Sequence, residues 1–239
     1  MLISNAAARA LDEVAVRERD VLQAYAPGAA PVHTDVAKPP AAQPVLDPLC
    51  VAPPADAYFV TSDDRGRMLF TRDGDFRLRG GALVDAQGQP MLGFSHDGAP
   101  LRPLLADAVD AALGYVKTAR VEPDGTVTYE RSTIDPRTGR RELQRAVMGR
   151  LALARFAPGT KFQAVDPQHV AAPLGITPHI GHAGDGNFGA VTPFARESSG
   201  IDLDLGLQRL QEAYLALDAI RAAGKAQGTL EKTAMDLLK

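Results

Sequence analysis

The stretch from residue 58 to 94 constrains the fold most, because short runs of alternating apolar and polar residues are separated by glycine-bearing turns. Such alternation is typical of half-buried antiparallel strands. Asp73-Gly74 and Gln87-Gly88 supply glycines, which adopt the positive φ of a tight hairpin turn without steric cost. The segment therefore predicts a β-meander. Its four predicted strands are residues 58–61, 68–71, 76–79 and 82–84.

The β pattern continues to about residue 190. Asp124-Gly125 predicts a hairpin bend, residues 135–139 predict a second hairpin tip, and residues 151–156 predict another strand. Residues 104–113 match only part of a helical stripe, and residues 173–193 are rich in Gly and Pro, which predicts a loop. The predicted core consists of Phe59, Phe70, Phe76, Leu83, Leu92, Val127, Leu153 and Phe156.

Both ends of the chain predict helices. Residues 3–25 carry a thin, alanine-rich apolar stripe that includes Ile3, Ala7, Leu11, Val14 and Leu22. In the C-terminal segment the apolar residues are spaced four, three, four and three apart, which is the rhythm of a coiled-coil seam. This seam is also the predicted assembly interface. Its members are Leu203, Leu207, Leu210, Tyr214 and Leu217.

These patterns predict a mainly β fold: an antiparallel, β-rich central domain flanked by N- and C-terminal helices that pack as a coiled coil. The alternative for the last helix is docking on its own domain. Residues 26–56 are rich in Pro and Ala, which disfavours helix and predicts an extended linker or a strap over the next domain. The predicted division is 1–25 for the first helix, 26–56 for the linker, 57–200 for the β domain and 201–239 for the last helix.

Composition argues against several function classes. The formal net charge of −3 provides no overall basic field for nucleic acid, and no apolar run approaches the length of a membrane-spanning helix. Asp12, Glu13 and Glu18 interrupt the N-terminus, so it does not match a cleavable secretory signal. No phosphate-binding loop or dinucleotide fingerprint is present. The sequence therefore predicts no enzyme activity, no cofactor and no small-molecule substrate.

Three clusters could carry other chemistry. His179 and His182 with Asp185 could form an open zinc site, but their setting in a Gly-rich stretch favours exposed loop histidines. Acidic pairs at 63–64 and 73–75 lack the final Glu of a calcium loop, so turn chemistry explains them better. The lone Cys50 is expected to be an inert thiol. A basic cluster favours a solvated face or a contact with an acidic neighbour over a polyanion site; it consists of Arg137, Arg140, Arg141, Arg145 and Arg150.

The order of short motifs resembles that of the bacterial flagellar basal-body rod and hook proteins. An aromatic-Thr-Arg-x-Gly-x-Phe hairpin is followed by Leu-Val, a turn Gly, a closing Leu-Gly, an Asp-Gly-Thr-Val turn, a Gly-rich loop and an acidic segment before the last helix. The residues that carry the resemblance are Phe70, Thr71, Arg72, Gly74, Phe76, Leu83, Gly88, Gly93, Asp124, Gly125, Gly186, Phe188, Gly189, Glu197 and Ser199. The chain departs from the family after the first helix, where Ala26-Pro27-Gly28 replaces an Asn-rich motif, and at Gly200.

The resemblance implies a rod-type axial subunit of the flagellar basal body that acts by protein–protein assembly. Its implied partners are other axial proteins and copies of itself, and its implied location is the periplasmic rod, reached without a cleavable signal peptide. The alternative is an accessory paralogue, or a soluble binding module, that uses the same β domain without polymerising.

Overall fold

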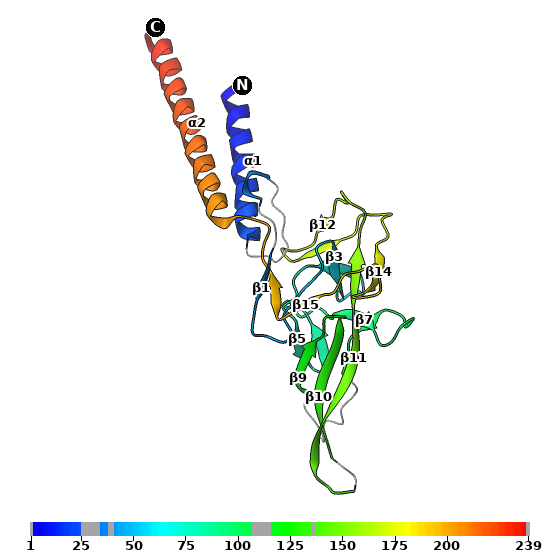
Figure 1. Cartoon of the computed structure of the whole chain (residues 1–239). Helices are drawn as coiled ribbons and strands as arrows, with labels where there is room; N and C mark the ends of the chain where they lie inside the picture. Colours follow the sequence, from blue (N-terminus) through cyan, green and yellow to red (C-terminus); the bar gives the residue numbers. More distant parts are fainter. Residues whose placement is uncertain (1, 25–33, 38–40, 107–115, 135–136, 238–239) are drawn as a thin grey trace. The chain divides into compact units, whose positions relative to one another are not determined.

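The computed structural model describes residues 2–24, 34–37, 41–106, 116–134 and 137–237, which form two compact units (Figure 1). The helical unit contains the described residues of Met1–Tyr25, Ala29–Pro40 and Ser199–Lys239, and the β unit contains those of Ala41–Ser198. The fold is mainly β with antiparallel sheets, one N-terminal helix and one C-terminal helix. That part of the predicted fold class is confirmed.

The helical unit consists of α1 (Leu2–Gln23), the 3₁₀ turn η1 (Thr34–Val36) and α2 (Leu203–Leu237). None of the helices over the described residues is long and apolar enough to cross a membrane. The described strands of the β unit are β1 (Ala42–Pro44), β2 (Val51–Ala52), β3 (Ala57–Ser62), β4 (Met68–Thr71), β5 (Arg77–Arg79), β6 (Ala82–Val84), β7 (Leu92–Phe94), β8 (Arg102–Pro103), β9 (Val116–Val121), β10 (Thr126–Ile134), β11 (Arg141–Arg155), β12 (Gln163–Ala164), β13 (His169–Ala171), β14 (His179–His182), β15 (Thr192–Pro193) and β16 (Ala195–Glu197).

One large antiparallel sheet organises the β unit. Its strands follow the order β12-β13-β4-β3-β11-β10-β9, with β7 and β14 also paired to β11 and β8 paired to β7. Smaller pairs join β1 to β16, β2 to β15 and β5 to β6. The long strand β11 is the central connector, because its second half pairs with β3 and its first half with β10.

The core lies where these strands pack together. Phe59 and Phe76 meet edge to face with ring centroids 4.9 Å apart, and both are completely or almost completely buried. Seven of the eight predicted core residues are buried, and Phe156 is partly buried against Phe70, with centroids 4.8 Å apart. The alternation in the sequence therefore placed the core correctly.

The first hairpin needs Gly74 for space rather than for its backbone angle. Gly74 is not among the positive-φ residues, contrary to the expected turn chemistry, whereas Gly88 has a φ of 90°. A Cβ atom on Gly74 would lie 1.7 Å from the backbone oxygen of Val51, so the two backbones can touch only because no side chain is present. The predicted strand 76–79 also begins one residue later, at Arg77.

Residues 41–56 belong to the β unit, which corrects the predicted linker over this part of 26–56. Strand β1 pairs with β16 and β2 pairs with β15, and Val51 and Ala52 are buried. The extended backbone that proline favours is compatible with edge-strand pairing as well as with a linker. The described part of this segment is therefore the strap that the sequence offered as an alternative.

Two other expectations need correction. Residues 173–193 are not entirely loop, because β14 pairs with residues 152–155 of β11 and β15 pairs with β2. Gly181 leaves room for the turn that follows β14, since a Cβ there would lie 2.2 Å from Asp185 Oδ2. Residues 104–106 are not helical, and the rest of the suggested helix at 104–113 lies outside the described residues.

Candidate assembly surface

Helices α1 and α2 lie side by side in opposite directions (Figure 1). Gly206, at the start of α2, faces Val21 near the end of α1: a Cβ on Gly206 would lie 3.5 Å from Val21 Cγ2. Further along α2, the hydroxyl of Tyr214 donates a hydrogen bond to Glu18, one turn earlier on α1. This bond raises the pKa of Tyr214. The two contacts advance in opposite senses along the helices, which establishes the antiparallel pairing.

The face of α2 that packs against α1 is displaced from the predicted seam. The least exposed positions recur at spacings of four and three, and Leu217 is buried at their centre. Of the predicted seam, Leu210 and Leu217 lie on this stripe and Leu203 is partly buried, but Leu207 is 48% exposed and Tyr214 is 43% exposed. The stripe itself consists of Gly206, Leu210, Ala213, Leu217, Ile220 and Gly224.

Two small residues lie on this stripe. Gly206 and Ala213 offer little area to bury, so a search for large apolar residues passes over them, although Gly206 faces Val21 of α1. On α1, Ala7 and Ala10 are among the less exposed positions, and Val14 is buried. Coiled-coil packing of the two helices remains a prediction.

The 3₁₀ turn η1 contacts both helices of the pair. Asp35 of η1 accepts a hydrogen bond from Arg17 of α1 at 2.8 Å and lies 3.4 Å from Arg209 of α2. The hydrogen bond from Arg17 is the main reason that the pKa of Asp35 is lowered. Val36 is fully buried, and its carbonyl accepts a hydrogen bond from the backbone N–H of Asp202 at 2.8 Å. One carboxylate therefore bridges both helices.

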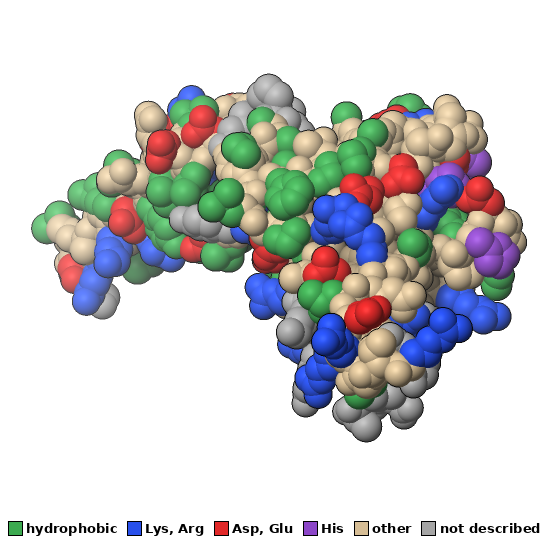
Figure 2. All heavy atoms as spheres, turned by 60° about the horizontal axis from the view of Figure 1, so that its bottom comes forward, with side chains coloured by type: hydrophobic (Ala, Val, Ile, Leu, Met, Phe, Trp, Pro, Cys, Tyr) green, Lys and Arg blue, Asp and Glu red, His purple; other side chains and the backbone are tan. Residues whose placement is uncertain are grey.

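The helical unit nevertheless leaves much apolar surface uncovered, as Figure 2 shows by the hydrophobic side chains along its helices. Helix α2 has 35 residues against 22 in α1, so its last turns extend beyond the packed stripe. We call the exposed large apolar side chains of this unit the outer apolar set. Its members are Leu11, Leu22, Leu207, Tyr214, Leu215, Leu230, Met235 and Leu237.

The motif residues of the β unit form a framework rather than a cavity. Arg72, which follows β4, and Glu197 of β16 make a buried double contact, with Nη2–Oε1 and Nε–Oε2 distances of 2.5 and 2.6 Å. Arg72 also donates to the carbonyl of Ala57 at 2.6 Å. The structure thus brings together two motif residues that are 125 positions apart in the chain.

The other motif residues serve local packing and turns. Phe70, Thr71, Phe76, Leu83 and Phe188 are buried. Gly125 has a φ of 78° in the bend that Asp124 closes by accepting a hydrogen bond from Thr126 N–H at 3.0 Å. Gly93 allows the close approach of β7 to β11, because a Cβ would lie 2.2 Å from the carbonyl oxygen of Arg150. The remaining motif glycines, Gly186 and Gly189, lie in the turn after β14. The hydroxyl oxygen of Ser199 accepts a hydrogen bond from the backbone N–H of Ile201.

The sequence did not predict a charged cluster around the buried side chain of His169. His169 of β13 lies between Asp85, at 2.9 Å from Nε2, and Asp166, at 2.8 Å from Nδ1. Both ring nitrogens can donate only when the imidazole is protonated. Burial alone would lower the pKa of His169, but the hydrogen bonds to the two carboxylates outweigh it and raise the pKa. His169 thus links the β12–β13 hairpin to the turn after β6, and no local motif indicated this role.

The histidines proposed for a zinc site do not converge on one point. His179 and His182 lie on strand β14 rather than on a loop. His179 stacks on Phe188, with ring centroids 5.5 Å apart, while His182 Nδ1 lies 3.0 Å from the carbonyl oxygen of Ala183. The carboxylate of Asp185 accepts backbone N–H groups of its own turn, including Asn187 at 2.9 Å. Each member therefore has a local structural role.

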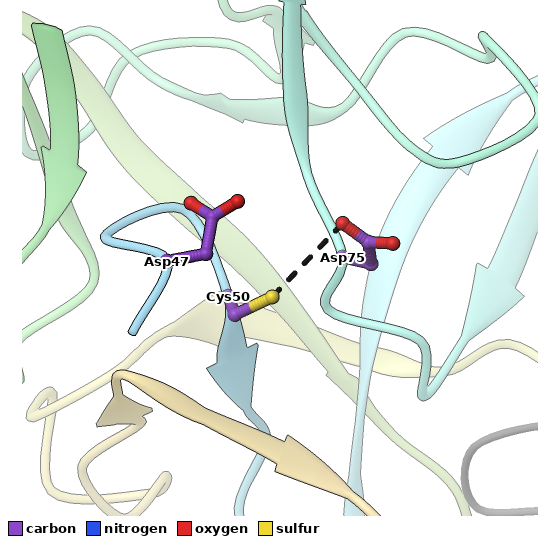
Figure 3. Close-up of side chains that lie close together, drawn as sticks. All are labelled: Asp47, Cys50 and Asp75. Atoms are coloured by element: carbon purple, nitrogen blue, oxygen red, sulfur yellow. Dashed lines mark hydrogen bonds between the residues drawn. The ribbon is translucent and has the colours of Figure 1, made fainter. Parts of the chain in front are cut away.

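Turn chemistry also accounts for the acidic pair at 63–64. Asp63 accepts the backbone N–H groups of Arg65 and Arg67 at 2.9 and 2.8 Å. Among the described residues, the one group with donors close enough to share a metal ion is Asp47, Cys50 and Asp75 (Figure 3).

That group favours a protonated thiol. Cys50 is buried and points toward Asp75, with Sγ 4.0 Å from Oδ1, while Asp47 already accepts the N–H of Leu49 at 2.9 Å. Burial raises the pKa of Cys50 to about 11, with smaller contributions from Asp75 and Asp47. A thiol of this kind is unreactive at neutral pH, in agreement with the expectation from sequence.

No protein-family model matches this chain, and no curated protein matches it either. Function must therefore be argued from the residues themselves. The described geometry offers packing surfaces, buried ionic links and turns, and the helical unit carries the eight exposed apolar side chains of the outer apolar set.

Proposed function

We propose that this chain is a structural subunit of the bacterial flagellar basal body, of the rod type, that acts by assembling with neighbouring protein chains. The observation that carries the proposal is the outer apolar set: both ends of the chain meet in one helix pair whose large apolar side chains remain exposed. Exposed apolar surface of this kind marks protein–protein contact in soluble proteins. Neighbouring subunits would cover it.

The ordered motifs supply the second support. Arg72 and Glu197 lie at opposite ends of the motif series and form one buried ion pair, so the series describes a single folded framework rather than scattered matches. A framework with a closed core can serve as a structural part of an assembly without any turnover. The proposed partners are other axial proteins and copies of this chain.

The proposed location is the periplasmic rod, and the proposed route is export without a cleavable signal peptide. Both follow from the family resemblance. Mass spectrometry of the cytoplasmic and the exported protein tests the route: the same N-terminus is expected in both, and a shorter N-terminus in the exported protein would contradict export without cleavage.

A second candidate function is an accessory paralogue or soluble binding module that uses the same β domain without polymerising. The observation that favours it is the segment Ala26-Pro27-Gly28, which stands where rod proteins carry their Asn-rich motif. The two candidates differ in one measurable property. A rod subunit is retained in purified basal bodies, whereas an accessory module is absent from them.

The decisive experiment combines that fractionation with matched variants. Leu22→Glu and Leu230→Glu place charges on the outer apolar set, where the native side chains are exposed and the fold should tolerate them. We expect both variants to fold but to be lost from basal bodies. The control is Leu174→Glu, at a fully exposed leucine of the β unit, which should be retained.

Three results would contradict the proposal. The native chain could be absent from basal bodies, which would favour the accessory module. The helix variants could be incorporated normally, which would remove the outer apolar set as the joint. The control variant could be lost as completely as the helix variants, which would show a general intolerance of added charge. Circular dichroism of each purified variant verifies that the chain is folded.

A further inference from the structure

The hairpin of β10 and β11 has one uncovered edge. Strand β11 pairs with β10 over residues 141–150, and its opposite edge pairs only from Arg150 onward, with β7 and then β3. Among the described residues, nothing pairs with that edge over residues 141–148. Figure 1 shows this hairpin continuing past the other described strands of the β unit. We call residues 141–148 the open edge.

Side chains along the open edge alternate in a regular way. Because successive residues of a strand point to opposite faces, Arg141, Leu143, Arg145 and Val147 share one face. Leu143 is 61% exposed and Val147 is 59% exposed. Ile134, which is opposite Arg141 in the register, adds a third exposed apolar side chain to that face. Arginine and apolar residues thus alternate along this face of the strand.

The arginines of this region divide into paired and unpaired ones. Arg120 pairs with Glu122 at 2.8 Å and Arg150 with Asp97 at 2.8 Å. Arg140, Arg141 and Arg145 form no ion pair within the part of the chain that the structure describes. Figure 2 shows Lys and Arg side chains gathered around this end of the β unit. The unpaired positive charge therefore lies on the open edge itself.

Next to Arg145 the same sheet face is hollowed. A cavity of about 250 Å³ lies over β9 and β10, and its lining includes Thr118, Thr128 and Glu130. Glu130 is opposite Arg145 in the register, but its Oε2 accepts a hydrogen bond from Thr118 at 2.9 Å. Among the described residues, the carboxylate that this face offers near the open edge is that of Glu130, and it is already engaged.

We propose that the open edge binds an extended acidic segment of a partner protein by strand addition. The backbone of that segment would pair with β11, and its alternate side chains would lie beside those of the open edge. Carboxylates would then stand opposite Arg141 and Arg145, and apolar side chains opposite Leu143 and Val147. The spacing specifies an acidic residue at every fourth position, with an apolar residue midway between.

Two simpler explanations fit less well. Charged residues on an edge strand can serve only to prevent aggregation, but then exposed Leu143 and Val147 would work against that purpose. A second copy of the chain could also pair there. Symmetric pairing centred on Leu143 would set Arg141 against Arg145, and like charges directly opposite each other are destabilising. The charge pattern thus favours an acidic partner.

The inference goes beyond the rod proposal and does not rest on it, because it uses no residue of the helical unit. The probe is a fluorescein-labelled peptide of sequence VTETVKE, which matches residues 147 to 141 in antiparallel order. Its fluorescence anisotropy is measured against the full-length protein at low salt. We expect saturable binding that weakens about tenfold or more in the double variant Arg141→Glu/Arg145→Glu, because each arginine–carboxylate attraction becomes a repulsion.

The matched control is Arg65→Glu/Arg102→Glu, which changes the net charge equally at two exposed arginines of the β unit. It should bind the peptide within about twofold of the native protein, because only long-range charge differs. A peptide N-methylated at alternate residues keeps its charges but loses backbone donors, and it should not bind. Thermal unfolding verifies that each protein variant is folded.

Each other outcome overturns the proposal. Equal weakening in both double variants would show attraction to net charge alone. Undiminished binding of the N-methylated peptide would exclude strand addition. Absence of peptide binding, with heparin bound in its place, would identify a polyanion site. Self-association lost on Arg141→Glu/Arg145→Glu, without peptide binding, would identify a contact between copies.

Discussion

The β unit and the helical unit differ in how they bury their apolar side chains. The β unit closes its core within its own described strands, where Phe59, Leu83 and Leu153 are fully buried. The helical unit buries Leu217 and Val14 but leaves eight large apolar side chains outside. Strands from distant parts of the chain can surround a core, whereas two helices can cover only one stripe of each other. The β unit thus encloses its core and leaves other apolar side chains, such as Leu143 and Val147, outside it, whereas the helical unit buries only the stripe between its two helices.

Charged groups show the same contrast. In the β unit, Arg72 and Glu197 form a buried pair, and buried His169 lies between the buried Asp85 and the partly exposed Asp166. In the helical unit, the pairs Arg209–Glu212 and Arg17–Asp35 lie at the surface. Surface pairs contribute little to folding, while removal of one partner from a buried pair leaves an isolated charge in a poor solvent. The two units should therefore respond very differently to equivalent mutations.

The largest expected difference comes from the ion pairs. Arg72→Met should destabilise the β unit by about 3–5 kcal/mol, because Glu197 would stay buried without its partner. Arg209→Met, the matched change in the helical unit, should lower the free energy of unfolding far less, because both partners of this pair are in contact with solvent. Urea unfolding followed by circular dichroism measures both free energies. Similar values for the two variants would end the contrast between buried and surface pairs.

Leucine truncation is expected to be slightly less severe. Leu83→Ala should lower the free energy of unfolding by about 2–5 kcal/mol, since the side chain is fully buried and a cavity would remain. Leu207→Ala should change it by less than about 1 kcal/mol, since that side chain is half exposed. The same urea titration compares them. A large effect at Leu207 in a monomer would mean that the helical unit is more closed than its exposure indicates.

The His169 cluster predicts a pH dependence confined to the β unit. The folded pKa of His169 is raised above its ordinary value of 6.5, so the stability that the protonated ring contributes is fully present below about pH 6.5. It is lost as the pH rises through the folded pKa. His169→Gln should cost about 1.5–3 kcal/mol at low pH, where charged hydrogen bonds to Asp85 and Asp166 are removed.

The measurement is thermal unfolding of both proteins between pH 5 and pH 9. The native protein should lose stability toward high pH relative to His169→Gln, so the two curves should converge. A constant difference across that range would assign His169 a packing role without proton linkage. The helical unit contains no histidine among its described residues and should not share the effect.

The smallest expected effect concerns the contact between Tyr214 and Glu18. Tyr214→Phe removes one exposed hydrogen bond, so the loss of stability should be the smallest among these variants. Circular dichroism at 222 nm over a concentration series reports it together with assembly. Helical signal should rise with protein concentration in both proteins, because neighbours cover the outer apolar set. A signal independent of concentration would indicate that the helix pair is already complete.

Sequence reasoning succeeded where the pattern was local. Alternation located β4 and β6 at their observed bounds, and Asp124-Gly125 marked a real bend. It failed where distant segments supplied the reason. Strand β14 forms by pairing with β11, far away in the sequence, and the hydrogen bond from Val51 N–H to the carbonyl oxygen of Gly74 is possible because Gly74 has no side chain to meet the backbone of Val51. Gly74 does not differ in sequence from a loop glycine.

The candidate surfaces follow the same division. The heptad spacing in the last helix was visible in the sequence, but the choice of its buried face was not. That choice depends on the small residues Gly206 and Ala213, which matter only because α1 packs there. The basic residues of the β10–β11 hairpin were also visible. Their position on an unpaired edge depends on where β7 and β3 join β11.

The sequence by itself determined the periodic features: two terminal helices, a chain of short strands and the core residues that alternate along them. Periodicity follows from backbone geometry and needs no knowledge of partners. Only the tertiary structure decided which residues 125 positions apart form the Arg72–Glu197 pair, how His169 meets Asp85, and which helix face stays outside. Those outcomes depend on contacts between residues that are distant in the sequence. Such contacts do not change the sequence pattern around either residue, so the pattern cannot predict them.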